Sequence, residues 1–345
     1  MKPILVVLTG GTIGSSMENG KIGLRGGTAR ILELYRHTYG NDCFETVCPI
    51  TLLSENMTPY DWARLYGCLR DVRTERYAGL IVCHGSDTLP YTAALLGFLF
   101  RHLPIPLILV ASNRPLGTEG SNGLSNFAAA VRLIRREALP GVYVSYENTP
   151  GDMRLYLSTR LLEADPYHDR FMSYGGIDLA RITEQGLLPF ASSCNPSLSR
   201  LRQPRPPIDC PVLDPEKPIA LIRPYPGLDY RQFRWAVKPC AILHTDYHSD
   251  TASTAPGPYG LPGFVARCTE EGIPVYLCSL RQSHRALYET TLQLLQIGVR
   301  PLFSLSTEAA LAKLRVAYNQ TAMPPEEYLK TDIYYELAEK SSENT

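Results

Sequence analysis

The sequence predicts an α/β protein of two domains, with a parallel, doubly wound sheet in the N-terminal domain and a smaller α/β domain after it. Short apolar runs alternate with helical segments along the N-terminal half. Turn residues bound each run, which is typical of strands buried in a parallel sheet. A proline-rich stretch at residues 203–217 interrupts the alternation, and the pattern then resumes. With 345 residues, the chain is long enough to form two hydrophobic cores.

The N-terminal domain is expected over residues 1–202. Its expected strands are residues 4–8, 46–52, 80–83, 107–110 and 141–145. Its expected helices cover residues 28–36 and begin again at Thr58 and near Thr88. Thr58 can cap its helix, and Pro59 fits the first helical position because that position needs no N–H donor. Strands and helices therefore alternate in the order that builds a parallel sheet.

The segment 203–217 is expected to be a linker, because it holds five prolines and shows little periodicity. The C-terminal domain is expected over residues 218–345. Its expected strands are residues 219–223, 241–244 and 275–278, and its expected helices are residues 261–271, 285–297 and 307–318. The tail after Pro324 has the pattern of an amphipathic helix.

Charge and composition exclude several classes of partner. Lys and Arg number 34 and Asp and Glu also number 34, so the chain has no net charge and no nucleic-acid partner is expected. No apolar stretch has the length of a membrane span, and no signal peptide precedes the first expected strand. The nine cysteines show no CxxC spacing. We therefore expect a cytoplasmic protein with reduced cysteines and no membrane partner.

Two short motifs that contain glycine and hydroxyl side chains follow expected strands. The first is Thr-Gly-Gly-Thr-Ile-Gly at residues 9–14, and the second is His-Gly-Ser-Asp-Thr at residues 84–88. Both should lie at the carboxyl ends of strands in one sheet, where open α/β sheets bind ligands. Thr12 and Ser86 would supply two candidate nucleophiles, Asp87 a carboxylate, and the turns exposed N–H groups. These are the parts of a hydrolase that forms a covalent intermediate.

Each motif also has a simpler interpretation. Thr12 can be an ordinary turn residue, and Asp87 can be a carboxylate favoured by the dipole of a following helix. His84 is interpreted as a structural histidine that forms hydrogen bonds, and not as a base. A dinucleotide site is disfavoured, because Gly-x-Gly-x-x-Gly is absent and no helical pattern begins directly after the first turn. The two motifs occurring together favour the catalytic interpretation of Thr12.

One further polar cluster could bind a metal ion, because it contains the possible ligands His244, Asp246, His248 and Asp250. Its spacing fits neither a zinc motif nor a calcium motif. No metal site is therefore expected there.

The order of the motifs resembles that of the bacterial L-asparaginase/glutaminase family, closer to its cytoplasmic type I branch. Four blocks carry the resemblance: residues 9–13, Ser-Glu-Asn-Met-Thr-Pro at 54–59, residues 84–88, and Asn-Arg-Pro-Leu-Gly at 113–117. A weaker block lies at residues 307–314. The first and third blocks are specific when they occur together, in this order and at this separation.

The resemblance implies a hydrolase that releases ammonia from the side-chain amide of a free amino acid. Thr12 would be the nucleophile and would form an acyl-enzyme intermediate. Backbone groups at Gly11 and Gly85 would stabilise the oxyanion and contact the substrate. Ser86 would replace the second threonine of the family. The backbone around Ser112 would face the leaving amide.

The resemblance also implies which residues recognise the amino acid. Ser54 and Asp87 would bind its α-carboxylate and α-amino groups, and Glu55 would add negative charge for the ammonium. The resemblance implies no cofactor and no metal. It implies a homodimer or homotetramer, with a small amino-acid amide as substrate.

The sequence departs from the family at three places. The family's loop tyrosine is missing, and Lys21 occupies the nearest position in the expected lid loop, residues 15–25. The family's triad lysine is absent from residues 158–165, where Arg160 is the candidate replacement. Residues 247–253 replace a Gly-x-Gly-Asn segment. An arginine cannot release its proton to act as a base. We therefore expect slower chemistry or another proton acceptor, such as Lys21.

Several functions remain open at this stage. L-asparagine is the leading substrate, with L-glutamine as a weaker one. A related amidase with another small amide substrate is the first alternative, and a catalytically silent protein that binds aspartate or asparagine is the second. A component of a tRNA-dependent amidotransferase is disfavoured, because no additional N-terminal domain is evident and the neutral charge indicates no RNA partner.

Overall fold

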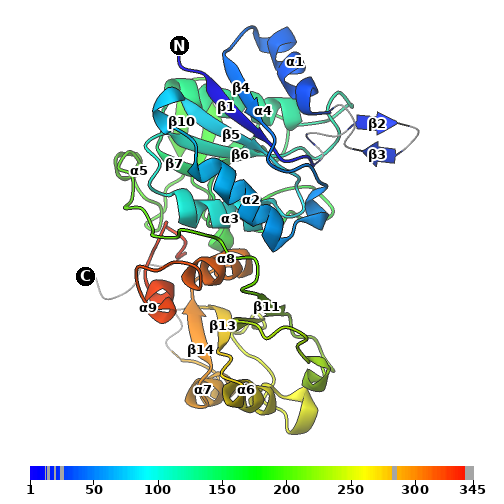
Figure 1. Cartoon of the computed structure of the whole chain (residues 1–345), viewed down its shortest axis with the longest axis vertical. Coiled ribbons are helices and arrows are strands. Elements are labelled where there is room, and N and C mark those ends of the chain that lie inside the picture. The colour runs from blue at the N-terminus through cyan, green and yellow to red at the C-terminus, as the bar shows by residue number, and fades with distance from the viewer. Residues whose placement is uncertain (12, 14–15, 19–20, 24–26, 282–285, 339–345) are drawn as a thin grey trace.

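The computed structural model describes the whole chain except residues 12, 14–15, 19–20, 24–26, 282–285 and 339–345. Two bodies follow one another along the long axis of the molecule (Figure 1). The first is built on an eight-stranded sheet and the second on a four-stranded parallel sheet. The predicted two-domain α/β fold is therefore confirmed.

The large sheet has the strand order β10-β9-β8-β7-β6-β5-β1-β4. Its strands are β1 (Ile4–Leu8), β4 (Phe44–Val47), β5 (Gly79–Cys83), β6 (Pro106–Val110), β7 (Gly141–Glu147), β8 (Met153–Leu157), β9 (Ala180–Thr183) and β10 (Gly186–Pro189). The five strands from β4 to β7 are parallel, as expected. The sequence interpretation did not include β8, β9 and β10, which extend the sheet with antiparallel pairs. Short turns join β7 to β8 and β9 to β10, as antiparallel neighbours allow, whereas the longer segment 158–179 joins β8 to β9.

Helices cover both faces of the large sheet, which makes it doubly wound. They are α1 (Gly27–Tyr39), α2 (Pro59–Arg70), α3 (Leu89–Phe100) and α4 (Gly123–Arg136). Helix α1 packs against α4, and α3 packs against α8 (Thr307–Ala317) of the second domain. The expected N-cap of α2 is present, since Thr58 and Asp61 form a reciprocal capping box.

The small domain has four parallel strands in sequence order: β11 (Ile219–Ile222), β12 (Ala241–Thr245), β13 (Val275–Leu280) and β14 (Arg300–Phe303). Helices α6 (Leu261–Glu270) and α7 (Glu289–Gln296) lie at the end of this domain that is remote from the large sheet (Figure 1). The short helix α5 (Leu198–Leu201) lies just before the proline-rich segment. No helix among the described residues is long and apolar enough to cross a membrane.

Two segments differ from the sequence interpretation. The expected lid loop, 15–25, contains an antiparallel hairpin of β2 (Ser16–Glu18) and β3 (Lys21–Gly23). The expected amphipathic tail helix is short, because α9 spans only Pro325–Lys330. Residues 331–338 follow it without helical structure, and we call them the C-terminal strap. Their backbone groups bond to Glu336 of the strap itself and to side chains elsewhere in the chain, such as Thr159, and not to one another as in a helix.

The C-terminal strap is buried between the domains around one ion pair. Lys313 Nζ lies 2.6 Å from Glu336 Oε1, and both side chains are 0% exposed. The Glu336 carboxylate also accepts hydrogen bonds from the backbone N–H groups of Ile333, at 2.9 Å, and Tyr334, at 2.6 Å. Tyr334 reaches the large sheet, where its hydroxyl accepts from the Val142 N–H at 2.7 Å. The strap therefore connects α8 to β7.

Replacement of Lys313 by Met should destabilise the protein strongly. The change leaves the Glu336 carboxylate buried without its counter-charge, which costs about 3–5 kcal/mol of unfolding free energy. Urea denaturation measures this difference. The double variant Lys313→Met, Glu336→Gln should recover part of the loss, since it removes both charges. A loss below about 1 kcal/mol in the single variant would contradict the assigned role.

Candidate active site

The two glycine-containing motifs lie next to each other because β1 and β5 are neighbours. Leu8 pairs with Cys83 at the carboxyl ends of these strands. Just beyond, the Thr9 hydroxyl donates to the Cys83 carbonyl at 2.9 Å. The two turns then meet at Gly11 and Gly85. A Cβ atom on Gly11 would collide with the backbone of Gly85 and lie 3.0 Å from the carbonyl carbon of His84.

Gly11 has a second reason to be a glycine, because its φ is +71°. This value lies in the left-handed region that favours glycine. Its N–H donates to the Leu52 carbonyl at 2.9 Å. The Gly11 N–H is therefore occupied, and its expected role as an oxyanion donor has to pass to other N–H groups. Gly11 itself provides the close approach of the first turn to the second.

The block at residues 54–59 joins the same place. Leu52 N–H donates to the Thr9 carbonyl at 3.1 Å, which holds the 52–58 segment against the first turn. Ser54 is buried, and its hydroxyl donates to Asp87 Oδ2 at 3.2 Å. The Thr88 hydroxyl donates to the Ser54 carbonyl at 2.9 Å. Ser54 and Asp87 are thus brought together, as expected from the sequence.

The charged groups of this cluster face outward. Asp87 is exposed and lies just before α3, whose N-terminal end favours a negative charge. Ser86 beside it is partly exposed. Glu55 is exposed on the single helical turn Ser54–Asn56. Two carboxylates and a hydroxyl therefore surround one end of the sheet, an arrangement that suits a small ligand with an ammonium group.

His84 has the environment of a structural residue. Its side chain is 0% exposed, and Nδ1 lies 2.8 Å from the Gly85 carbonyl oxygen. Burial lowers the pKa of His84 to about 4. The imidazole is therefore neutral at physiological pH, and its bond to Gly85 orients the second turn.

The Ser112 side chain is directed into its own loop. Its hydroxyl donates to the Arg114 carbonyl and lies 3.1 Å from the Ser121 hydroxyl. Ser112 follows β6, and β6 borders the second motif because the His84 N–H donates to the Val110 carbonyl at 2.9 Å. The Ser112 hydroxyl is therefore occupied within its own loop.

Thr12 lies outside the described residues. For Lys21 the structure describes the backbone, in β3, where it pairs with Glu18.

Arg160 occupies a different place from the one predicted. Its guanidinium donates to the carbonyl groups of Cys194 at 2.8 Å and Leu337 at 2.9 Å, to Asn195 Oδ1 at 3.2 Å, and to the Tyr335 carbonyl. It is 2% exposed. The guanidinium thus holds the C-terminal strap and the 194–195 turn. These contacts give Arg160 a structural role in place of the triad role expected from the sequence.

The sequence interpretation missed a polar cluster one helical turn beyond Asp87. The Tyr91 hydroxyl donates to Glu163 Oε1, and Arg223 Nη2 lies 3.1 Å from the Tyr91 hydroxyl and 3.2 Å from Glu163 Oε1. Glu163 belongs to the 158–165 segment that the resemblance assigned to the triad. Tyr91 lies four residues after Asp87, a spacing that places both on one side of a helix, and this was the signal that the sequence offered. The contribution of Arg223 from the second domain could not be inferred from the sequence.

This cluster borders a cavity of about 350 Å³ between the domains. Asp246 and Glu308 also line it. Burial, and then the nearby Asp250 carboxylate, raises the pKa of Asp246 to about 7. His244, from the same stretch of the sequence, bonds instead to the Tyr230 hydroxyl at 2.8 Å, and Asp250 pairs with Arg281 at 3.1 Å. His244 and Asp250 therefore have separate partners.

The family of this chain follows from its similarity to known proteins. Residues 3–195 match the model of the asparaginase family described as "Asparaginase, N-terminal". The chain belongs to the asparaginase family. The resemblance seen in the sequence is thus confirmed. The matched residues include every block at the large-sheet site.

Two kinds of relative within the asparaginase family match the chain. L-asparaginase 1 of Escherichia coli (strain K12) is 27% identical over 339 residues, which cover 92% of each chain. The second kind consists of components of glutamyl-tRNA(Gln) amidotransferases. The one from Pyrococcus abyssi is 27% identical over 275 residues, which cover 76% of this chain but only 59% of that relative's length. The one from Metallosphaera sedula is 27% identical over 92% of this chain and 72% of its own.

Solved structures show the same fold. The thermostable L-asparaginase from Thermococcus kodakarensis superposes with a TM-score of 0.76 at 25% identity, covering 98% of this chain and 100% of its own. L-asparaginase I from Vibrio cholerae gives a TM-score of 0.74 at 22% identity, covering 97% of this chain and 99% of its own. Both domains are therefore part of the family fold.

Asp246 should make the stability of the protein depend on pH. The unfolded chain releases this proton near the ordinary pKa of 3.8, whereas the folded protein keeps it up to about 7. The unfolding free energy should therefore fall as the pH rises from about 4 to about 7. In Asp246→Asn, the fall between about pH 5 and pH 8 should be smaller by about 2–3 kcal/mol.

Urea denaturation at the two pH values provides this measurement. Asp71→Asn is the matched control, because the Asp71 side chain is 73% exposed. Equal pH dependence in wild type and Asp246→Asn would show that the Asp246 proton is not linked to folding.

Proposed function

We propose that the protein hydrolyses L-asparagine to L-aspartate and ammonia through an acyl-enzyme intermediate on Thr12. The observation that carries the proposal is the convergence of the two turns with Ser54 and Asp87 in a chain of the asparaginase family. The match to a relative named L-asparaginase 1 over 92% of both chains supports the choice of substrate.

The proposed reaction has two steps. The Thr12 oxygen attacks the side-chain amide carbon, and the amide nitrogen leaves as ammonia after it receives a proton. Water then attacks the resulting ester, which releases aspartate and restores the Thr12 hydroxyl. Backbone N–H groups of the two turns other than that of Gly11 stabilise the negative oxygen in both steps. Ser86 supplies a second hydroxyl beside the reacting carbonyl.

Recognition of the amino acid uses the charged rim of the site. Asp87 and Glu55 attract the α-ammonium group, and the Ser54 hydroxyl binds the α-carboxylate. Before the substrate arrives, the Ser54 hydroxyl donates its one proton to Asp87. This proton turns to the α-carboxylate when the substrate binds, because a hydroxyl has a single proton to donate.

The proton acceptor is proposed to be Lys21. A guanidinium stays protonated at physiological pH, and that of Arg160 is held by carbonyl groups elsewhere. A lysine can release its proton when its surroundings disfavour the charged form. We further propose a homodimer or homotetramer located in the cytoplasm, the arrangement that the resemblance implies.

Thr12→Ala should abolish ammonia release from L-asparagine. Loss of the nucleophile is expected to lower kcat by more than about a thousandfold, and Thr12→Ser should retain measurable activity. The assay compares L-asparagine, L-glutamine and D-asparagine for each variant. Full activity in Thr12→Ala would overturn the acyl-enzyme on Thr12, whereas preference for another amide would redirect only the substrate assignment.

Lys21→Met tests the proton acceptor separately. If Lys21 accepts the proton, one limb of the wild-type pH–rate profile reports its ionisation and is missing in the variant. Arg160→Lys serves as a contrast, because it should lower the melting temperature and leave the shape of the profile unchanged. A limb that persists in Lys21→Met would assign the proton to another group.

The relatives named as amidotransferase components favour a second candidate, in which the released ammonia serves a partner enzyme. The match that covers 92% of this chain and 72% of the Metallosphaera sedula relative supports it. Free asparaginase activity by the purified chain would count against this candidate. Heat stabilisation by aspartate without ammonia release would instead indicate a binding protein.

A further inference from the structure

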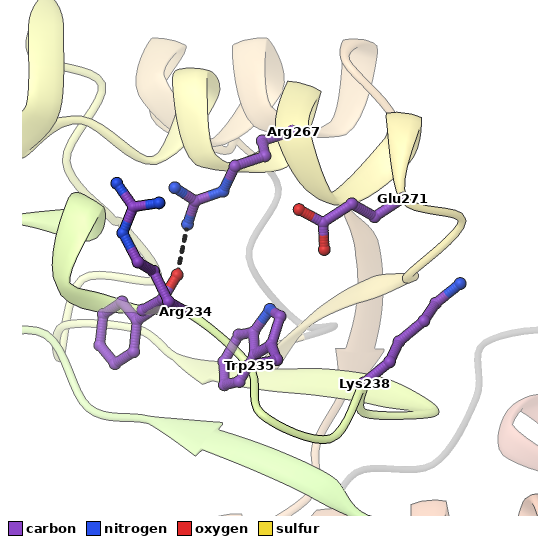
Figure 2. A pocket seen from close by; sticks show the side chains of 6 residues that line it. Arg234, Trp235, Lys238, Arg267 and Glu271 are labelled. Atoms are coloured by element: carbon purple, nitrogen blue, oxygen red, sulfur yellow. Dashed lines mark hydrogen bonds between the residues drawn. The ribbon is translucent and has the colours of Figure 1, made fainter.

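A second pocket lies on the small domain, away from the large-sheet site. Figure 2 shows the side chains that line it, from the segment 233–238 and from helix α6 and its end. The lining residues are Phe233, Arg234, Trp235, Lys238, Arg267 and Glu271. Its volume is about 350 Å³, which is at the small end of the range for ligand pockets. None of these residues belongs to the proposed active site.

The floor of this pocket is held rigidly. Arg267 on α6 donates to the Phe233 carbonyl at 2.8 Å and to the Tyr230 carbonyl at 3.2 Å, the first of which Figure 2 draws as a dashed line. The Phe233 ring stacks on Trp235, with centroids 6.2 Å apart and planes 23° apart. Phe233 also meets Phe264 edge-on at 5.8 Å. These contacts fix the partly exposed Trp235 indole in the pocket.

The charges around the indole are unbalanced. Arg234, Lys238 and Arg267 provide three cations against the single carboxylate of Glu271. Arg234 and Lys238 are exposed, and neither has an ion-pair partner within the described part of the chain. Other surface arginines do have one, as Arg231 does with Asp229. Two cations beside an aromatic ring are therefore left available for a ligand.

We propose that this pocket binds a nucleotide. The ligand's planar base would stack against Trp235, and its phosphate would bind Arg234 and Lys238. Aromatic stacking and charge-assisted hydrogen bonds to phosphate are both strong interactions of these side chains. The Glu271 carboxylate can accept a hydrogen bond from an amino group or a ribose hydroxyl. A simple anion would leave the indole unused, and an uncharged ring would leave the cations unused.

Figure 2 shows where the cationic side chains lie relative to the Trp235 ring. The Trp235 ring lies between the guanidinium groups of Arg234 and Arg267 on one side and the Lys238 side chain on the other. A ligand on the ring can therefore reach a cation at either edge. Because Arg267 already holds the floor, Arg234 and Lys238 are the residues that discriminate between charged and uncharged ligands.

Titration with AMP and ATP tests the proposal. The chain has two tryptophans, so Trp62→Phe leaves Trp235 as the only indole reporter. Nucleotide binding should quench its fluorescence with saturation, and calorimetry on the wild-type protein should give the same Kd. Arg234→Gln and Lys238→Gln should each weaken binding about tenfold or more. Arg231→Gln is the matched control, because it removes one nearby positive charge that is already paired.

Fragments of ATP test how much the base and the phosphates each contribute to binding. Adenosine and inorganic triphosphate should each bind far more weakly than ATP. Triphosphate that binds as tightly as ATP without quenching Trp235 would overturn the nucleotide assignment, as would the absence of saturable binding by calorimetry. If Arg231→Gln weakens nucleotide binding as much as Arg234→Gln and Lys238→Gln do, the binding is a general attraction between charges. That result would also overturn the nucleotide assignment.

Ammonia release is measured beside nucleotide binding, so that failure of the nucleotide proposal can be told apart from failure of the proposed function. Arg234→Gln and Lys238→Gln should release ammonia at the wild-type rate without nucleotide, because both residues lie outside the proposed catalytic machinery. Nucleotide binding to Thr12→Ala should likewise be unchanged. A loss of nucleotide binding in Thr12→Ala would contradict the separation of the two sites.

Discussion

The position of β1 directly beside β5 is the constraint from which the rest of the site follows. Two parallel neighbours end at the same edge of the sheet, so the turns after them must share a small space. Gly11 and Gly85 make that contact possible because neither carries a side chain. Ser54 then donates to Asp87 of the second motif, and the Thr88 hydroxyl donates to the Ser54 carbonyl. The sheet order therefore brings the two motifs of the proposed site together.

Much of this site could be predicted because it is local in sequence. The motif around Gly85 and Asp87 follows an apolar strand, and its glycine, hydroxyl and carboxylate lie within four consecutive residues. Arg160 shows where such prediction fails. Its partners are carbonyl groups of the C-terminal strap, which lie far along the chain and leave no mark on residues 158–165.

The centre of the large sheet could also be predicted, because the signal of each of its strands is local in sequence. Each parallel strand of the large sheet's centre is a short apolar run, whereas β9 and β10 are short, partly exposed and weakly patterned. The C-terminal strap escaped prediction as well. Its residues resemble an amphipathic helix, but Glu336 satisfies the N–H groups of Ile333 and Tyr334, which competes with helical hydrogen bonding.

The packing of α3 against α8 restricts how the molecule can move. Buried side chains of both helices, such as Phe98 and Leu314, belong to one continuous hydrophobic cluster that also contains Tyr334. A hinge between the domains would have to expose that cluster to water. A hinge motion between the domains is therefore costly. We expect the small domain to move together with α3, the helix that follows Asp87.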